Sequence, residues 1–191
     1  MSAGALVEAV VKVGGGLLSA PAHLDAALMS IAQAAQERRL LIVPGGGPFA
    51  DAVREVDRRV GLPDEAAHWM AVLAMDQYAH LLVSRVPGGA LVHEREEIAQ
   101  AFAAGRVPVL APSRWLRKAD PLPHTWDVTS DSIAAWVAGA LGASRLVLVK
   151  PVGAAVHGLV DPYFSHALPA DLTPTIVAAD RLDALSAALR G

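Results

Sequence analysis

Two runs of three glycines are the residues best suited to bind a ligand. Residues 14–16 follow the apolar stretch 6–13, and residues 45–47 follow the apolar stretch 40–43. Glycine lets the backbone approach a ligand closely, and free N–H groups at the start of a following helix attract anions. We therefore predict that both runs bind phosphate groups. Two tight structural turns are the alternative, since strand-to-glycine turns are common in α/β folds.

Lysine is scarce in this chain, and its positions are informative. There are three lysines against 13 arginines, and Lys12 and Lys150 interrupt or end apolar strands in VVKVGGG and LVLVKPVG. A lysine in a buried strand is costly to desolvate unless it is paired or reaches a ligand. Each ammonium group either reaches solvent at a strand end or contacts a ligand beside the glycines. We favour ligand contact, with both lysines neutralising charge on a transferring phosphoryl group.

An acidic run, DVTSD at residues 127–131, begins a predicted helix. Asp131 falls near the first turn, where the helix dipole favours an acidic side chain. It can serve as a plain cap, orient the two lysines, or hold magnesium that is bound to a nucleotide. The spacing alone leaves these roles open.

Other candidate sites give weaker signals. The sequence has no GxxxxGK[ST] motif, no GxGxxG after a strand, no HExxH and no GxSxG. Asp76 and His80 share a helix face at i,i+4 spacing, which is usually a surface contact, so we predict no metal site. Trp115, His124 and Trp126 lie on an irregular stretch, where they either pack or wall a small aromatic or cationic substrate.

Apolar periodicity divides the chain into alternating strands and helices. We predict strands over residues 6–13, 40–43, 107–110, 146–150 and 175–178. We predict helices over residues 21–35, 49–60, 64–83, 95–104, 130–141 and 181–190, the fifth capped by Thr129 or Ser130 and the last by Asp180. Residues 113–127 are expected to form a loop or a short hairpin. This alternation predicts an α/β fold with a mostly parallel sheet and helices on both faces.

The composition limits the function classes. Apolar residues make up 53% of the chain and charged residues 18%, which suits a sheet covered on both faces. A net charge of −3 gives no reason to expect nucleic acid or an anionic membrane as a partner. The absence of cysteine excludes disulfides and thiolate chemistry. No membrane span or secretory signal is evident, so we expect a single cytoplasmic domain.

The sequence resembles the amino acid kinase superfamily, which includes acetylglutamate, aspartate and uridylate kinases. Four blocks in the family's order carry the resemblance: KVGGGLL (12–18), PGGGPFAD (44–51), DVTSDSIA (127–134) and LVLVKPVGAAVHGLVDP (146–162). The resemblance implies a three-layer αβα sandwich that transfers the γ-phosphate of ATP, with Mg²⁺, to a phosphate or carboxylate acceptor. The short length and the helix HWMAVLAMDQYAHLL (68–82) look most like a smaller branch, which includes the (aminomethyl)furan methyl phosphate kinase of methanofuran biosynthesis.

The resemblance also implies roles for individual residues. The catalytic residues it implies are Lys12, Asp131 and Lys150, with the aspartate organising the lysines. The nucleotide-binding residues it implies are Lys12, Gly14, Gly15, Gly16, Lys150 and Asp161, with the segment after Lys150 bordering the nucleotide. The acceptor-binding residues it implies are Gly45, Gly46, Gly47, Arg54, Trp126 and Asp127, the last two as candidate partners of an ammonium group. Residues 1–112 would form the acceptor half of one domain and residues 113–191 the nucleotide half.

One departure from the family pattern bears on activity. Larger members carry a further Gly-Gly…Lys segment that supplies a second phosphate-contacting lysine, whereas the 29 residues after Pro162 contain no Gly-Gly pair and no lysine. Either Lys150 takes this role, or catalysis is weak, or the protein binds a nucleotide or oxyanion without phosphorylating. The apolar helix over residues 64–83 favours a homodimer or a higher homo-oligomer.

Overall fold

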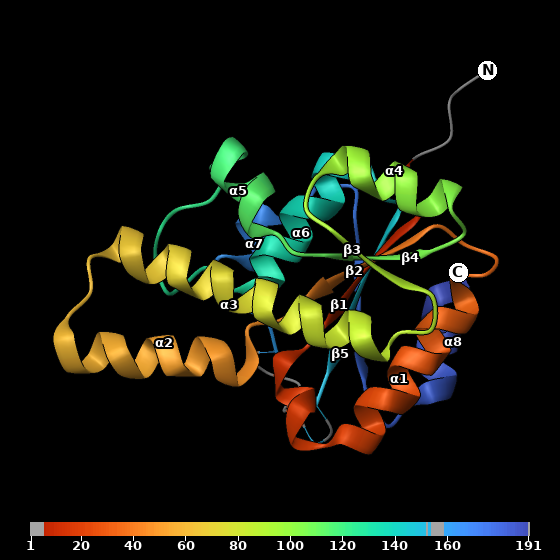
Figure 1. The fold of residues 1–191 in the computed structure, drawn as a ribbon, viewed down its shortest axis with the longest axis horizontal. Helices are drawn as coiled ribbons and strands as arrows, with labels where there is room; N and C mark the ends of the chain where they lie inside the picture. The colour runs from red at the N-terminus through yellow and green to blue at the C-terminus, as the bar shows by residue number, and fades with distance from the viewer. Residues whose placement is uncertain (1–5, 152, 154–158, 191) are drawn as a thin grey trace.

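The computed structural model describes residues 6–151, 153 and 159–190, which fold around one six-stranded sheet (Figure 1). Its strands are β1 (Ala9–Val13), β2 (Leu40–Pro44), β3 (Gly89–Val92), β4 (Val107–Leu110), β5 (Arg145–Lys150) and β6 (Pro174–Ala178). Its helices are the 3-10 helix η1 (Gly15–Ser19), α1 (Pro21–Ala34), α2 (Gly47–Val60), α3 (Asp64–Arg85), α4 (Arg95–Ala103), α5 (Ser113–Ala119), α6 (Ser130–Leu141), α7 (Phe164–Ala167) and α8 (Leu182–Arg190).

The sheet brings both glycine runs to one edge. Its strand order is β3-β4-β2-β1-β5-β6, and every described pair of neighbours is parallel. The carboxyl ends of β1, β2 and β5 therefore lie together. The glycine runs continue the ladder there, because the Gly14 N–H donates to the Val149 carbonyl at 2.9 Å and the Gly45 N–H donates to the Val13 carbonyl at 2.8 Å.

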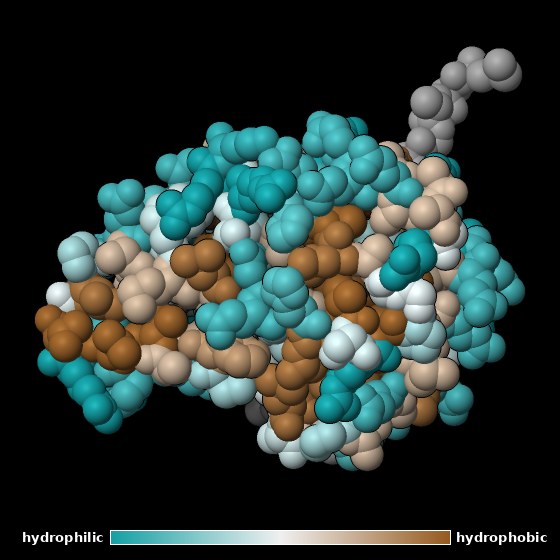
Figure 2. All heavy atoms as spheres, in the orientation of Figure 1, coloured by the Kyte–Doolittle hydropathy of each residue, from teal (hydrophilic) through white to brown (hydrophobic). Residues whose placement is uncertain are grey.

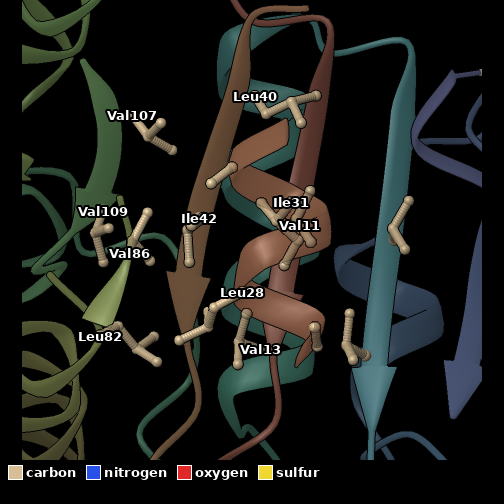
Figure 3. Close-up of a cluster of buried hydrophobic side chains, with 14 of the residues drawn as sticks. Val11, Val13, Leu28, Ile31, Leu40, Ile42, Leu82, Val86, Val107 and Val109 are labelled. Carbon is tan, nitrogen blue, oxygen red and sulfur yellow. The ribbon is translucent and has the colours of Figure 1, made fainter. Parts of the chain in front are cut away.

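Alternating residues of the central strands face two different helical layers. Val11 and Val13 of β1 belong to a buried cluster with α1, α8 and the C-terminal part of α3 (Figure 3). Val10 belongs to a second cluster with α4, α5, α6 and α7. This period of two residues places Lys12, which lies between Val11 and Val13, on the same side as α6.

Most predicted elements are present, but several segments differ from the prediction. The expectation of a loop or hairpin over residues 113–127 is wrong at its start, where Ser113–Ala119 form α5. The strand β3 and the short helix α7 were not predicted. The first strand is shorter than expected, because it begins at Ala9 rather than at residue 6. The strands β1, β2 and β5 end at the glycine-bearing edge close to where the periodicity placed their carboxyl ends, whereas the 3-10 helix η1 after β1 was not predicted.

The α2–α3 hairpin projects from the body of the molecule (Figure 1). Apolar side chains gather at its projecting end (Figure 2). Along the hairpin, Val60 is 67% exposed, and Val56, Met70 and Leu73 are also exposed. Within the described ranges, no helix has both the length and the hydropathy needed to cross a membrane.

Candidate functional site

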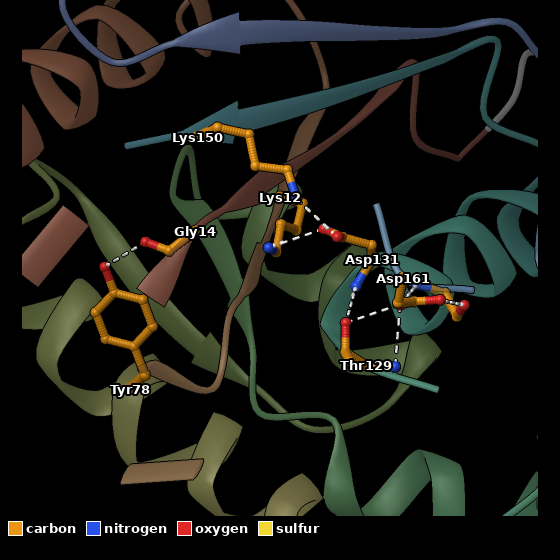
Figure 4. A network of polar contacts seen from close by, with 8 residues as sticks. Lys12, Gly14, Tyr78, Thr129, Asp131, Lys150 and Asp161 are labelled. Atoms are coloured by element: carbon orange, nitrogen blue, oxygen red, sulfur yellow. Dashed lines mark hydrogen bonds and ion pairs between the residues drawn. The ribbon is translucent and has the colours of Figure 1, made fainter. Parts of the chain in front are cut away.

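Two lysines and one aspartate form a buried charge cluster at the carboxyl ends of β1 and β5 (Figure 4). The Lys12 ammonium forms an ion pair with Oδ1 of Asp131 at 2.9 Å. The Lys150 ammonium donates to Oδ2 of the same carboxylate at 2.7 Å. Lys12 and Asp131 are each 5% exposed, and Lys150 is 9% exposed. The prediction that each lysine could reach solvent at a strand end is therefore excluded.

The sheet register explains why both lysines reach the same carboxylate. Lys12 pairs with Leu148, so Lys150 lies two residues further along the neighbouring strand. Residues two apart on a strand point to the same face, and residues at matching positions of paired strands share that face. The Lys12 and Lys150 side chains therefore both extend toward α6, whose first turn holds Asp131.

The charge balance of this cluster favours an anionic ligand. Burial works against the charged carboxyl of Asp131, but the neighbouring Lys12 and Lys150 ammonium groups outweigh burial and lower its pKa below 3.8. Burial, aided by the charge of Lys12, lowers the pKa of Lys150 despite the attraction of Asp131. Two ammonium groups against one carboxylate leave an excess positive charge, which a phosphate group would neutralise.

The geometry bears on the roles that the sequence left open for Asp131. Each carboxylate oxygen lies next to an ammonium group, at 2.9 Å for Lys12 and 2.7 Å for Lys150, which suits a residue that orients the two lysines. Across the described part of the chain, no group of three or more His, Asp or Glu side chains could hold a metal ion.

The two glycine runs contact each other and form one surface. A Cβ atom on Gly15 would lie 2.1 Å from the Gly47 nitrogen, and a Cβ atom on Gly45 would lie 2.5 Å from the Gly15 nitrogen. Gly47 also has a φ of +55°, which favours glycine. Among the described residues, no side chain caps the start of α2 at Gly46, and N–H groups at an uncapped helix start bind anions. Buried Tyr78 of α3 supports the turn by donating to the Gly14 carbonyl at 3.4 Å.

A cavity of about 150 Å³ lies against this glycine surface. Its lining includes Gly15, Gly46, Gly47, Arg54, Asp64, His68, Val72, Met75, Trp126, Thr129, Ser130 and Ile133. Gly15 and Ser130 connect the cavity to the segments that carry Lys12 and Asp131. Among the predicted acceptor-binding residues, Gly46, Gly47, Arg54 and Trp126 line the cavity, whereas Gly45 and the exposed Asp127 do not.

Aromatic groups at the outer part of the cavity are fixed by their neighbours. The Trp126 indole donates to Asp57 at 2.7 Å, and the Arg54 guanidinium lies 4.8 Å from its ring centroid. His68 stacks on His124 at 4.2 Å. Burial and the neighbouring His124 lower the pKa of His68 to about 4, so its imidazole is neutral at pH 7.

Sequence reasoning did not identify two lining residues, Asp64 and His68, as part of a binding site. Asp64 begins α3 as an ordinary first-turn acid, and His68 lies one turn further along the same helix. Their place in the lining follows from the antiparallel packing of α2 and α3, which the sequence does not encode as a local motif. Asp64 lies about 16 Å along α3 from Met75, at the outer rim of the cavity.

The predicted nucleotide-binding residues are only partly placed. Gly14, Gly15 and Gly16 adjoin the lysine cluster, and the Asp161 carboxylate lies against the start of α6. Residue 152 and residues 154–158, which belong to the segment expected to border the nucleotide, lie outside the described residues. Nucleotide contact by any of these residues stays a prediction.

Comparisons with known proteins agree on the kind of molecule. A family model described as the amino acid kinase family matches residues 8–154. The [5-(aminomethyl)furan-3-yl]methyl phosphate kinase of Methanocaldococcus jannaschii is 28% identical over 147 residues, which cover 75% of this chain and 65% of the relative, less than two thirds of its length.

Two solved structures share the fold. The uridylate kinase from Archaeoglobus fulgidus superposes with a TM-score of 0.72 at 16% identity, over 96% of both chains. The UMP kinase from Ureaplasma parvum superposes with a TM-score of 0.63 at 14% identity, over 92% of this chain and 91% of that one. These likenesses confirm the predicted fold class.

Proposed function

The chain belongs to the amino acid kinase family, and on that premise we propose that it transfers the γ-phosphate of ATP to a small phosphomonoester. The observation that carries this proposal is the buried Lys12–Asp131–Lys150 cluster, with its excess positive charge, beside the joined glycine turns. A site that only fixed the fold would not need two buried ammonium groups on one carboxylate, because burying charge is costly.

The acceptor that we propose is a ring-bearing alkyl phosphate such as [5-(aminomethyl)furan-3-yl]methyl phosphate, the compound in the name of the related kinase. Its phosphate group would lie on the N–H groups at the start of α2, with Arg54 as a further cation. Its ring would lie between apolar and aromatic walls that include Met75 and Trp126. The Trp126 indole is also the partner that we propose for the ammonium group, since Asp127 is outside the lining.

The mechanism that we propose needs no general base. An oxygen of the acceptor phosphate, already ionised at neutral pH, attacks the γ-phosphorus in line. A new P–O bond forms as the bond to the leaving oxygen of ADP breaks. Lys12 and Lys150 would stabilise the negative charge that shifts toward the leaving oxygen, while Asp131 keeps the two ammonium groups in place. Magnesium would arrive on the nucleotide phosphates, and no step is assigned to it.

The division of the chain follows from this placement. The acceptor would bind to the half formed by residues 1–112, with Trp126 closing the cavity. The nucleotide would bind to the half formed by residues 113–191, together with the Gly14–Gly16 turn.

We further propose a homodimer or higher homo-oligomer that covers the exposed apolar residues Val56, Val60, Met70 and Leu73 of the α2–α3 hairpin. Light scattering at several protein concentrations tests the oligomer.

Replacing Lys12 separates a kinase from a protein that only binds a nucleotide or oxyanion. For K12A we expect kcat to fall about 10²–10³-fold, the usual effect of removing one transition-state donor, and nucleotide affinity to change far less. K118A is the matched control, because Lys118 is exposed and pairs with Glu94 at the surface. A K12A variant that loses affinity by the same factor as turnover contradicts catalysis by Lys12.

A further inference from the structure

The start of α6 is closed by a carboxylate from a distant part of the chain. Asp161 accepts hydrogen bonds from the backbone N–H of Thr129 at 3.0 Å and of Ser132 at 3.0 Å. It also accepts from both hydroxyl groups, at 2.7 Å from Thr129 Oγ1 and from Ser132 Oγ. Asp161 is therefore a helix cap provided from about 30 residues away, and Figure 4 shows it beside Thr129.

The residues that Asp161 holds are the neighbours of Asp131. Thr129 lies two positions before Asp131 and Ser132 one position after it. The Thr129 hydroxyl also accepts from the Asp131 N–H at 3.5 Å. The Asp131 carboxylate in turn accepts a hydrogen bond from the Lys150 ammonium group. Lys150 and Asp161 are therefore both bonded to the first turn of α6.

Asp161 also changes the electrostatics around the cluster. The N-terminus of a helix carries partial positive charge and exposed N–H groups, so an open start of α6 would compete for phosphate. The Asp161 carboxylate occupies that position, whereas the start of α2 has no side-chain cap. Phosphate groups are thereby left to the glycine turns and the two lysines.

We propose that Asp161 is a positioning residue, which fixes the Asp131 carboxylate between Lys12 and Lys150 by holding the first turn of α6. The inference rests on the proposed phosphotransfer only for its kinetic consequence. Its structural consequence, a changed environment of the Lys150 ammonium group, does not depend on turnover.

The chain offers a matched control in Asp76. The Asp76 carboxylate accepts from the Ser113 N–H at 3.1 Å and from the Ser113 hydroxyl, and so closes the start of α5 in the same manner. Both aspartates are half-buried. Helix α5 carries none of the residues placed in the site, so D76N removes a comparable cap without disturbing Asp131.

The first experiment compares D161N with D76N by thermal unfolding and steady-state kinetics. We expect both variants to unfold at a lower temperature, D161N to lose at least 10-fold in kcat with the acceptor KM within threefold, and D76N to keep kcat within twofold. Equal effects of the two variants on kcat would overturn the proposal. If D161N does not fold, S132A takes its place: a fall in kcat of threefold or more supports the proposal, and an unchanged kcat overturns it.

The second experiment follows the lysines by NMR. Protein with ¹³C-labelled lysine gives signals from three residues, and K118A and K150R assign them. We expect the Lys150 signal to titrate at lower pH in S132A, which keeps the Asp161 charge but loosens the first turn of α6, because Asp131 then contacts the Lys150 ammonium group less closely, and to be unchanged in D76N. An unchanged Lys150 titration in S132A overturns the positioning role. If the wild-type protein turns over no substrate, the proposed function fails, and this titration alone decides the role of Asp161.

Discussion

Replacing Asp131 by asparagine removes the charge that two buried ammonium groups share. At separations of 2.9 and 2.7 Å, each ion pair contributes about 6 kcal/mol of attraction at an effective dielectric constant of about 20. Desolvation of three charges and repulsion between the lysines offset much of that attraction. Breaking a buried pair by removing one partner costs about 3–5 kcal/mol, because uncompensated charge stays buried. D131N should therefore lose about 3–5 kcal/mol of unfolding free energy, which corresponds to a melting temperature lower by about 6–20 °C.

The loss should also depend on pH in a defined direction. The pKa of Asp131 is lowered below its ordinary value of 3.8 in the folded protein. Its contribution to stability is therefore complete above pH 3.8 and is lost as the pH falls through the lower, folded-state value. The difference in unfolding free energy between wild type and D131N should be largest near neutral pH and should shrink below about pH 4.

Urea unfolding at pH 3, 5 and 7 measures both effects. D76N is the control, because the Asp76 carboxylate of the wild type accepts hydrogen bonds from the neutral N–H and hydroxyl groups of Ser113. It should lose only about 1 kcal/mol, as is typical of a helix cap. A D131N variant that unfolds within 1 kcal/mol of the wild type at pH 7 would refute the reasoning that the cluster is buried and charged.

Two further substitutions test the acceptor cavity and the joined glycine turns. R54Q should raise the acceptor KM about tenfold with little change in kcat, because Arg54 is proposed to bind the ground state and the transition state alike. R58Q is the control, because Arg58 lies on the same helix but pairs with Glu55 at the surface, and it should change neither constant. Steady-state kinetics with varied acceptor measure both variants, and equal behaviour of the two would contradict the proposed place of Arg54. G15A should lose activity and about 1–3 kcal/mol of unfolding free energy, measured with urea, since its Cβ would lie 2.1 Å from the Gly47 nitrogen. G61A is the control, because a Cβ there meets nothing within 4 Å and only the φ of +66° is unfavourable. It should lose about 1 kcal/mol of unfolding free energy and keep its activity.

The fold was predictable because local signals and burial agree. The central strands are buried along their whole length and read as apolar runs, and glycine follows each strand where the chain turns. The resemblance carried by the four motif blocks is confirmed by the family match over residues 8–154. Of the two caps predicted for this helix, Thr129 and Ser130, the structure has Thr129, which precedes an acidic first turn.

The segments that sequence reasoning missed depend on distant partners. Helix α5 begins at Ser113 because Asp76 holds its first N–H from 37 residues away. Strand β3 is short, begins at a glycine and pairs only with β4 at the edge of the sheet. Neither feature leaves a periodic pattern in the chain.

The residues of the buried charge cluster were named from the sequence, but their geometry was not. The scarcity of lysine identified Lys12 and Lys150, but their convergence on Asp131 depends on the register between β1 and β5. The exclusion of Asp127 from the cavity depends on how residues 113–127 fold. The capping contacts of Asp161 join residues about 30 positions apart, so no local spacing reveals them.

Acceptor-dependent phosphoryl transfer is the central claim, and ³¹P NMR tests it most directly. The purified protein would be incubated with ATP, Mg²⁺ and [5-(aminomethyl)furan-3-yl]methyl phosphate, and then with a panel of other phosphomonoesters and amino acids. We predict that ATP is converted to ADP only when an acceptor is present, with the two coupled signals of a new diphosphate, and that the K12A variant carries out this conversion about 10²–10³-fold more slowly. ATP that stays intact with every acceptor, or that is hydrolysed at the same rate without one, would contradict the account.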